Sequence, residues 1–350
     1  MGRKHAMSDD HLALRHQGAI GRITLKRPKA LNALTADMAA AMLEQLRQWA
    51  VDPAVRAVVI DAVSGKAFCA GGDVRAVYDA GKRADGSVMS FFQTEYRMNA
   101  AIRRLPKPYI ALIDGFAFGG GCGVSIHGSH RVASENAVFS MPETAIGLFP
   151  DVGATYFLNQ LPGEIGMYLA LTSIRVSAAD ALYCGLATHF VPSRDHAAVL
   201  SRLAQGEKAD VVLAAFVGKA SGVNTLAEHR DAIDRAFSAS SVENILDRLE
   251  LEGDWGKETA SLLRDRSPTS LKVTFRQMRE GAALDFESCQ RMEFRIMARM
   301  MEGHDFHEGV RAALIDKDQS PGWQPSHLHM VSEAEIARYF APLDDREFTL

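Results

Sequence analysis

The sequence predicts an α/β fold with parallel strand pairing, and three observations lead to that prediction. Stretches typical of strands alternate with stretches typical of helices through the first half of the chain. Two glycine-rich loops each follow an expected strand. From about residue 163 onward the pattern becomes mainly helical. Parallel pairing is expected because strands that are separated by helices re-enter a sheet in the same direction.

The first expected elements are a strand, a helix and a second strand. The first strand is "AIGRITLKRP", which alternates from Ala19 and is stopped by Pro28. Thr35 is a suitable N-cap for a helix within residues 31–52, where apolar side chains recur at helical spacing: Met38, Met42, Leu46 and Trp49. The run "VRAVVIDAV" (residues 55–63) is rich in β-branched residues and predicts a buried strand.

One more helix and two more strand-like runs complete the expected core. The helix is "FFQTEYRMNAAIRRL", and the strand-like runs are "PYIALIDG" and "HRVASENAVFSM". Later residues are expected to form helices, with a helical insertion at about residues 195–260. This order predicts three regions: a disordered tail or tag (1–15), an α/β core (16–195) and a mainly helical C-terminal part (196–350).

Composition and cysteine usage narrow the class of protein. The formal net charge is −4 and 47% of residues are hydrophobic, so charge gives no reason to expect nucleic acid or a membrane as partner. The four cysteines lie far apart and form no CxxC pair, which favours reduced thiols over disulfides or a zinc ribbon. The first residues lack the apolar core of a signal peptide. A cytoplasmic protein is therefore expected.

The two glycine loops, "AFCAGGD" (residues 67–73) and "GFAFGGGCG" (residues 115–123), are candidates for ligand binding. Glycine lets a backbone approach a ligand closely and leaves its N–H available. The phosphate-binding pattern GxxxxGK[ST] and the dinucleotide pattern GxGxxG are both absent. Each loop could donate one N–H to a single oxygen and so form an oxyanion hole. Close packing of helix against sheet explains the glycines equally well.

Two acids stand in the apolar stretch "MPETAIGLFPDVG", which runs from Met141 to Gly153. Glu143 and Asp151 each follow a proline, and their neighbours are mostly aliphatic or aromatic. A carboxylate buried among such groups costs several kcal/mol unless it is paired or hydrogen-bonded. These acids are therefore candidates for catalysis, although an acid after a proline is more often a turn or cap residue.

The order of four motifs resembles the enoyl-CoA hydratase/isomerase (crotonase) superfamily: "RPKALNAL", "KAFCAGGDV", "GFAFGGGCG" and "MPETAIGLFPDVGATYFL". The stretches "ETAIGLFPDVG" and "GHDFHEGVRAALIDKDQSPGW" are most similar to its 3-hydroxyisobutyryl-CoA hydrolase branch. The resemblance implies a crotonase-like spiral of ββα units with a helical C-terminal part. It also implies an acyl-CoA substrate, no separate cofactor, and a homo-oligomer as one form of the protein.

The resemblance also assigns roles to individual residues. It places the two oxyanion-hole donors at Gly72 and Gly120, and a contact to the substrate, at its hydroxyl group, at Glu95. The adenine and pantetheine arms of CoA are expected along two loops, at Lys29, Ala30, Leu31, Lys66, Ala70 and Gly71.

One departure from the superfamily pattern decides the expected reaction. Hydratases of the superfamily carry a glutamate directly after "GGGC", where this chain has Gly123. Glu143 is retained and Asp151 is added, as in the hydrolase branch. The resemblance therefore implies hydrolysis of a short 3-hydroxyacyl-CoA thioester, best matched to 3-hydroxyisobutyryl-CoA in valine catabolism. Glu143 is expected to act as nucleophile, with a general-base role as the alternative.

Two other functions remain open from the sequence. An isomerase or hydratase that uses one acid is disfavoured by Gly123, and a non-catalytic acyl-CoA-binding protein would have little use for both acids. His304 and His307 have the spacing of metal ligands, but no third histidine joins them, so no metal is expected. Cys69 and Cys122 lack a histidine fixed nearby by motif and are expected to be buried filler.

Overall fold

The structure, a computed structural model, describes residues 11–63, 65–81, 86–222 and 224–350. The chain divides into two compact units, each assembled from three segments. Unit 1 comprises Met1–Asp73, Thr94–Phe139 and Val176–Val223, and unit 2 comprises Val74–Gln93, Ser140–Arg175 and Asn224–Leu350. The tail or tag expected at the N-terminus lies outside the described residues up to residue 10, while residues 12–15 belong to a strand. The predicted boundaries at 16 and 195 stay predictions.

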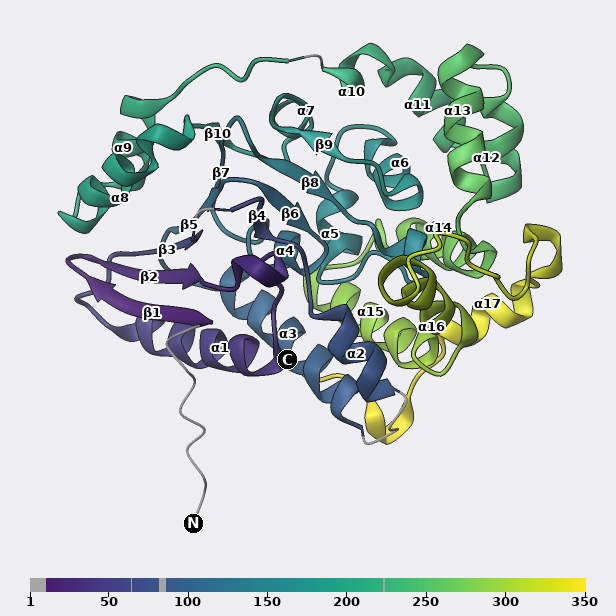
Figure 1. The fold of residues 1–350 in the computed structure, drawn as a ribbon, viewed down its shortest axis with the longest axis horizontal. Helices are drawn as coiled ribbons and strands as arrows, with labels where there is room; N and C mark the ends of the chain where they lie inside the picture. The colour runs from purple at the N-terminus through teal and green to yellow at the C-terminus, as the bar shows by residue number, and fades with distance from the viewer. Residues whose placement is uncertain (1–10, 64, 82–85, 223) are drawn as a thin grey trace. The chain divides into compact units, whose positions relative to one another are not determined.

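A six-stranded sheet forms the centre of unit 1 (Figure 1). Its strands, in spatial order, are β1 (Leu12–Gln17), β2 (Ile20–Leu25), β3 (Ala57–Ala62), β5 (Tyr109–Ile113), β7 (His130–Ala133) and β10 (His189–Phe190). The first pair is antiparallel, and every later pair is parallel. The predicted parallel α/β fold is thereby confirmed, and β1 adds a hairpin at the edge of the sheet.

A smaller sheet runs through the same repeats. Its strands, in order, are β4 (Ala67–Cys69), β6 (Phe116–Phe118), β8 (Val138–Ser140) and β9 (Val176–Ser177). Successive repeats thus each give one strand to the large sheet and the next to the small one, as a spiral of ββα units requires. The run at residues 130–141, expected as one strand, forms β7 and β8 because a turn interrupts it, where Asn136 N–H donates to Ser134 Oγ at 3.1 Å.

Helices cover the large sheet of unit 1. The helix predicted within residues 31–52 is α1 (Ala36–Val51). Thr35 caps it by accepting the N–H of Met38 at 3.2 Å. Its Trp49 packs on Gly21 of β2, where a β-carbon would overlap the indole ring. A core of Val59, Ile110, Leu112 and Val132 packs against Val199, Leu203, Val212 and Leu213 of two later helices. The remaining helices are α4 (Gly120–Gly123), α7 (Ala178–Cys184), α8 (His196–Ala204), α9 (Ala209–Phe216), η1 (Pro28–Ala30) and η3 (Ser193–Asp195), and α3 (Ser87–Arg103) belongs partly to each unit.

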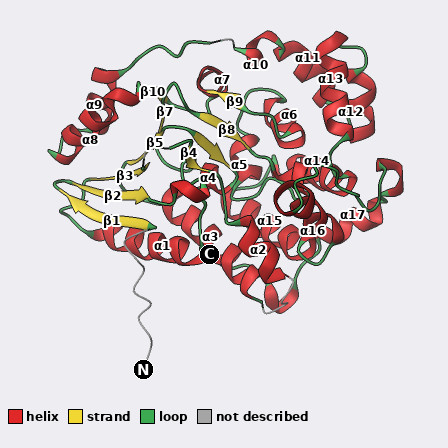
Figure 2. Cartoon of the chain, in the orientation of Figure 1, coloured by secondary structure: helices red, strands yellow, loops and turns green. Residues whose placement is uncertain are grey.

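Unit 2 is helical, as the sequence predicts for the C-terminal part (Figure 2). Its first helices are α2 (Val74–Gly81), η2 (Glu143–Ile146), α5 (Ala154–Leu158) and α6 (Ile165–Thr172). The later ones are α10 (Thr225–Glu228), α11 (Arg230–Phe237), α12 (Val242–Leu249), α13 (Gly253–Arg264), α14 (Pro268–Gly281), α15 (Phe286–Met300), α16 (His304–Val310), η4 (Arg311–Ile315), η5 (Leu328–Met330), α17 (Glu333–Phe340) and η6 (Asp344–Arg346). Among the described residues, none of the helices combines the length and apolar character that crossing a bilayer needs.

Candidate active site

The two loops expected to hold CoA are fastened to each other within unit 1. Ala70 N–H donates to Leu31 O at 3.0 Å, and Leu34 N–H donates to Gly71 O at 2.8 Å. Lys29 and Ala30 are exposed on η1, and Leu31 follows with a φ of +51°. Lys66, directly before β4, is also exposed. The structure therefore brings both predicted CoA-binding segments together.

Two residues that the sequence did not single out hold this arrangement. The side chain of Asn32 is fully buried; its Nδ2 donates to Ala67 O at 2.8 Å, and its Oδ1 accepts the N–H of Arg27 at 2.8 Å. The guanidinium of Arg27 donates to Ala33 O at 2.6 Å and forms an ion pair with Asp73 at 3.0 Å. The burial and the positive φ of Asn32 appear only in the structure, so the sequence carries no local signal for these hydrogen bonds.

The predicted oxyanion donors, Gly72 and Gly120, are neighbours. The parallel pairing of β4 with β6 puts the C-terminal ends of both strands at one edge of the small sheet. A β-carbon built on Gly120 would stand 3.1 Å from the N atom of Gly72, and one built on Gly71 would stand 3.5 Å from the N atom of Gly120. Gly120 begins α4, so its N–H has no acceptor within that helix. Two amides at this spacing are suited to one negatively charged oxygen.

Glu95 of α3 lies at the same place. Its Oε1 would be 2.7 Å from a β-carbon on Gly120, and the residue is 2% exposed. Burial raises the pKa of the nearby Cys69 thiol to about 12, and the charge of Glu95 adds to the rise. Cys122 is buried too, and its Sγ donates to Ala117 O at 3.1 Å. Cys69 thus lacks the low pKa of a nucleophilic thiol.

Glu143 lies in unit 2 as the first residue of η2 and is 6% exposed. The turn is closed by Leu148 N–H, which donates to Glu143 O at 2.9 Å, and by Gly147 in a left-handed conformation. Thr144 is fully buried, with its Oγ1 2.6 Å from Ser173 Oγ and 3.0 Å from Leu171 O. These bonds fix the backbone that carries Glu143.

The "GHDFHEG" segment supports this turn. It forms α16, which packs so closely on η2 that a β-carbon on Gly309 would overlap the backbone of Ile146. His304 Nδ1 lies 3.0 Å from Asp305 Oδ1, and the ring of His307 packs on Tyr78 with centroids 5.7 Å apart. In the part of the chain that the structure describes, no group of three or more His, Cys, Asp or Glu residues is arranged to hold a metal ion.

Asp151 precedes α5 in unit 2 and is 6% exposed. Two fully buried side chains form hydrogen bonds with the backbone on either side of Asp151. Gln277 Nε2 donates to Pro150 O at 2.6 Å, and Glu293 accepts the N–H groups of Gly153 at 2.7 Å and Thr155 at 2.9 Å. Neither residue was predicted from the sequence. No local pattern marks them, because their partners lie far away in the sequence.

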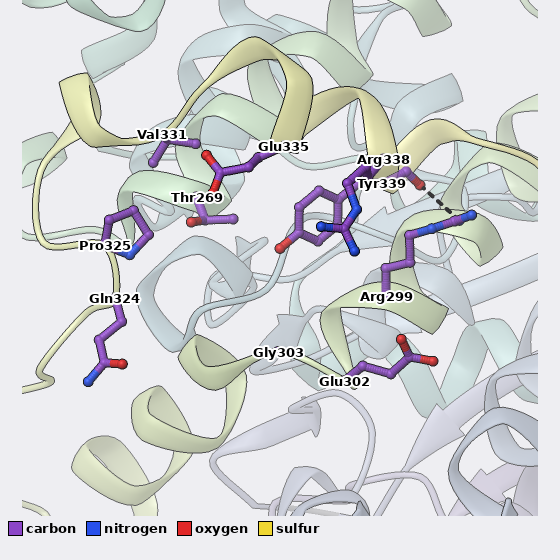
Figure 3. Close-up of a pocket in the computed structure, with 10 residues that line it drawn as sticks. All are labelled: Thr269, Arg299, Glu302, Gly303, Gln324, Pro325, Val331, Glu335, Arg338 and Tyr339. Carbon is purple, nitrogen blue, oxygen red and sulfur yellow. Dashed lines mark hydrogen bonds between the residues drawn. The ribbon is translucent and has the colours of Figure 1, made fainter.

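The predicted residues therefore form two groups. Gly72, Gly120 and Glu95 meet within unit 1, and Glu143 and Asp151 belong to one buried segment of unit 2. None of them lines the cavity of about 380 Å³ in Figure 3, which lies within unit 2. Its wall includes Arg299, whose Nη1 donates to Tyr339 O at 3.4 Å, and Arg338 with Glu335.

Comparison with known proteins identifies curated relatives that share nearly the whole chain. A protein from Xenopus tropicalis named "3-hydroxyisobutyryl-CoA hydrolase, mitochondrial" is 47% identical over 99% of this chain and 92% of its own length. Proteins of the same name from Danio rerio and Homo sapiens are 46% and 43% identical, covering 95% and 97% of this chain and 90% and 91% of their own lengths.

Solved structures also match the fold over almost its full length. A structure titled carnitinyl-CoA dehydratase, from Mycobacterium thermoresistibile, has a TM-score of 0.92 at 39% identity and covers 97% of this chain and 98% of its own. One titled enoyl-CoA hydratase, from Rhodobacter sphaeroides, has a TM-score of 0.90 at 39% identity and covers 97% and 99%.

The predicted cytoplasmic location is contradicted by these comparisons. The three curated relatives above are all named mitochondrial proteins. The prediction came from cysteines without disulfide partners and from the composition of the first residues. Reduced thiols indicate a reducing compartment and do not distinguish one such compartment from another.

The family is established by a match along most of the sequence. The family model described as enoyl-CoA hydratase/isomerase matches residues 20–340. This range contains both sheets, both glycine loops and the acids Glu143 and Asp151. The chain therefore belongs to the enoyl-CoA hydratase/isomerase family.

Proposed function

We propose that this chain hydrolyses the thioester bond of 3-hydroxyisobutyryl-CoA, releasing CoA and 3-hydroxyisobutyrate. The observation that carries this function is the 43–47% identity, over nearly the whole chain, to relatives named for that hydrolysis. Because 3-hydroxyisobutyryl-CoA arises when valine is degraded, the chain would act in branched-chain amino acid breakdown.

The first requirement of the reaction is a polarised carbonyl. In the proposed mechanism the N–H groups of Gly72 and Gly120 donate to the thioester oxygen. Their closeness supports this role, because two preorganised donors stabilise the negative charge that develops when the carbonyl carbon is attacked. Lys29, Ala30, Leu31, Lys66, Ala70 and Gly71 would bind the CoA arms, which is consistent with the hydrogen bonds between their two loops.

The second requirement is a nucleophile. The Glu143 carboxylate attacks the carbonyl carbon, the C–S bond breaks, and the CoA thiolate leaves and takes up a proton. The resulting anhydride is then hydrolysed by a water molecule that Asp151 orients and deprotonates. Alternatively, Glu143 acts as general base and water attacks the thioester directly. A carboxylate that is already ionised needs no proton removed before it attacks, which favours the nucleophilic role.

The third requirement is recognition of the acyl group. Of the three acids predicted for the site, Glu95 belongs to unit 1. Its closeness to Gly120 would put its carboxylate beside the polarised carbonyl. A buried carboxylate can accept a hydrogen bond from the substrate's 3-hydroxyl group, which would favour 3-hydroxyacyl substrates over those that lack the hydroxyl. Water is the only co-reactant that hydrolysis needs, so neither a cofactor nor a metal enters the proposed reaction.

Hydration of an enoyl-CoA is the second candidate, because the two solved structures above carry dehydratase and hydratase titles. Gly123 argues against it. A hydratase of this superfamily is expected to use two glutamates on water, and glycine has no side chain to orient or deprotonate water. Whether the chain forms a homo-oligomer stays a prediction, which size-exclusion chromatography with light scattering tests.

A direct assay separates the candidates. The purified chain is incubated with 3-hydroxyisobutyryl-CoA and, separately, with crotonyl-CoA, while free thiol and alkene absorbance are recorded. Hydrolase activity predicts thiol release from the first substrate and unchanged absorbance with the second. Loss of alkene absorbance without thiol release identifies a hydratase. Binding of both compounds without turnover identifies a non-catalytic binder.

A further inference from the structure

The backbone directly after Asp151 adopts a conformation that its sequence disfavours. Val152 has a φ of +53° and Gly153 a φ of +84°, so two successive residues lie in the left-handed region. For a β-branched residue this conformation is a genuine outlier, because Cβ crowds the backbone. Such a residue persists only where its surroundings impose it, and such places concentrate at functional sites.

Glu293 supplies one part of that imposed geometry. Its two carboxylate oxygens accept the N–H groups of Gly153 at 2.7 Å and Thr155 at 2.9 Å. These amides lie at the start of α5. The N-cap residue of α5 is Gly153, which has no side chain that could cap the helix. A carboxylate at the start of a helix is stabilised both by the free N–H groups and by the helix dipole. Glu293 thus caps α5 from a distant helix, α15.

Gln277 holds the other side of Asp151. Its Nε2 donates to Pro150 O at 2.6 Å and to Thr155 Oγ1 at 2.7 Å. Gln277 lies on α14, and α14 contacts α5 as α15 does. Gly281, at the end of α14, permits this approach, because a β-carbon there would overlap Cγ2 of Thr155. Hydrogen bonds therefore hold the backbone on both sides of Asp151: Gln277 binds Pro150, one residue before it, and Glu293 binds Gly153, two residues after it.

Given the hydrolase activity proposed above, on which this inference rests, we infer that Glu293 and Gln277 are positioning residues that aim the Asp151 carboxylate. They act through the backbone of residues 150–155 and need not touch substrate. Since a misplacement of a reacting group by about 1 Å can cost about 100-fold in rate, loss of this grip is expected to appear in kcat rather than in CoA affinity.

The charge of Glu293 adds a second link to Asp151. Burial raises the pKa of the Glu293 carboxyl to about 8. Hydrogen bonding with the side chain and N–H of Thr155 and with the N–H of Gly153 opposes the rise, and the charge of Asp151 adds to it. Because Glu293 becomes charged only as the pH rises through about 8, its repulsion with Asp151 acts in that alkaline range, and a neutral side chain at this position removes the resulting pH dependence of the step that uses Asp151. A role limited to packing would not have this effect.

Glu293→Gln is the central variant, because it keeps the size of the side chain and removes its charge and one acceptor. The matched control is Glu287→Gln, which removes a carboxylate from the same helix where it lies 3.7 Å from Arg291 and is part-exposed. Gln277→Met is the second variant: it removes the donor to Pro150 and Thr155, and it carries the same test if Glu293→Gln does not accumulate as folded protein.

The test measures loop protection and turnover on the same proteins. We expect amide exchange in a peptide covering residues 150–158 to become at least about tenfold faster in Glu293→Gln than in Glu287→Gln. With 3-hydroxyisobutyryl-CoA we expect kcat to fall about 10- to 100-fold and KM to stay within about threefold. We also expect the variant to lack the change in kcat that ionisation of Glu293 causes in the wild type around pH 8. Glu287→Gln should match the wild type in all of these.

Two results would overturn the inference. One is an amide exchange rate at residues 150–158 that is the same in Glu293→Gln as in Glu287→Gln. The other is that Glu293→Gln has the same kcat per folded molecule and the same pH profile as Glu287→Gln. An inactive wild-type chain would instead refute the proposed hydrolase function. In that case there is no Asp151 chemistry to position, and the exchange measurement still decides whether Glu293 holds the turn.

Discussion

The Oε1 atom of Glu95 lies 2.7 Å from the point that a β-carbon on Gly120 would occupy. The N atom of Gly72 lies 3.1 Å from the same point. A carboxylate and two backbone amides thus border one small volume that only glycine leaves open. This relationship explains why Gly120 tolerates no side chain, while close packing explains Gly121, where a β-carbon would stand 2.1 Å from Cys69 O.

Gly120→Ala should therefore reduce turnover. The added methyl group would have to displace Glu95 or the backbone at Gly72, and losing one oxyanion donor costs about 10²–10³ in kcat. Thiol release from 3-hydroxyisobutyryl-CoA measures the effect. Gly65→Ala is the control, because a β-carbon there would meet its nearest atoms at an ordinary 3.7 Å. Equal activity of the two variants would contradict the assignment of Gly120.

Glu143→Ala and Asp151→Ala should each lose most of kcat, by roughly 10²–10⁴-fold, while CoA affinity changes little. The reason is that the proposed CoA contacts lie on the loops at Lys29 and Lys66, and neither acid belongs to those loops. Steady-state kinetics and calorimetric titration with CoA measure the two quantities. A variant with near wild-type kcat would show that its acid has no catalytic role.

Gly123→Glu should slow hydrolysis rather than improve it. This change restores the acid that hydratases of the superfamily carry, next to the proposed thioester site, and a second carboxylate there would weaken Glu143 as a nucleophile. We expect lower thiol release and a trace of crotonyl-CoA hydration, seen as loss of alkene absorbance. Faster hydrolysis would mean that Gly123 does not mark the lost hydratase acid.

Glu143 should take up ¹⁸O from water if it is the nucleophile and water attacks the enzyme side of the anhydride. After many turnovers in ¹⁸O-enriched water, attack of water on the enzyme side of the anhydride leaves ¹⁸O in the Glu143 peptide, which mass spectrometry detects. Attack on the substrate side leaves none, so hydroxylamine is added in parallel to trap the acyl-enzyme. Absence of both label and trapped adduct would favour the general-base role.

Glu293 should make stability depend on pH. Its carboxyl has a pKa of about 8 when folded, raised by burial from its usual 4.5, so the unfolded chain ionises first as pH rises. The wild type should therefore lose stability relative to Glu293→Gln between about pH 4.5 and 8, by at most about 1.4 kcal/mol per pH unit, and the difference should level off above that range. Urea unfolding of both proteins at several pH values tests this, and a constant difference would contradict it.

The local parts of the fold could be predicted from sequence because their causes are local. The Thr35 cap, the β-branched strand β3 and the glycine loops each depend on a few adjacent residues. The run that became β7 and β8 was misjudged, because the short turn at Ser134–Asn136 lacks glycine and proline. Resemblance to a known superfamily, rather than periodicity, supplied the pairing of the two glycine loops.

The supporting part of the candidate site could not be predicted, because its contacts join distant residues. Glu293 lies 140 residues from Gly153, and Gln277 lies 127 residues from Pro150. No local pattern marks such pairs, and within their own helices both residues resemble ordinary polar positions. The left-handed Val152 is equally hidden, since valine gives no sign of that conformation.

Thioester hydrolysis by this chain can be followed through the oxygen atom that water contributes to the product. The chain is incubated with 3-hydroxyisobutyryl-CoA in ¹⁸O-enriched water, and all acyl products are analysed by mass spectrometry together with free CoA. Thioester hydrolysis predicts ¹⁸O in the carboxylate of released 3-hydroxyisobutyrate and an equal amount of free CoA. Unchanged substrate, or label found only in acyl groups that are still bound to CoA, would contradict it.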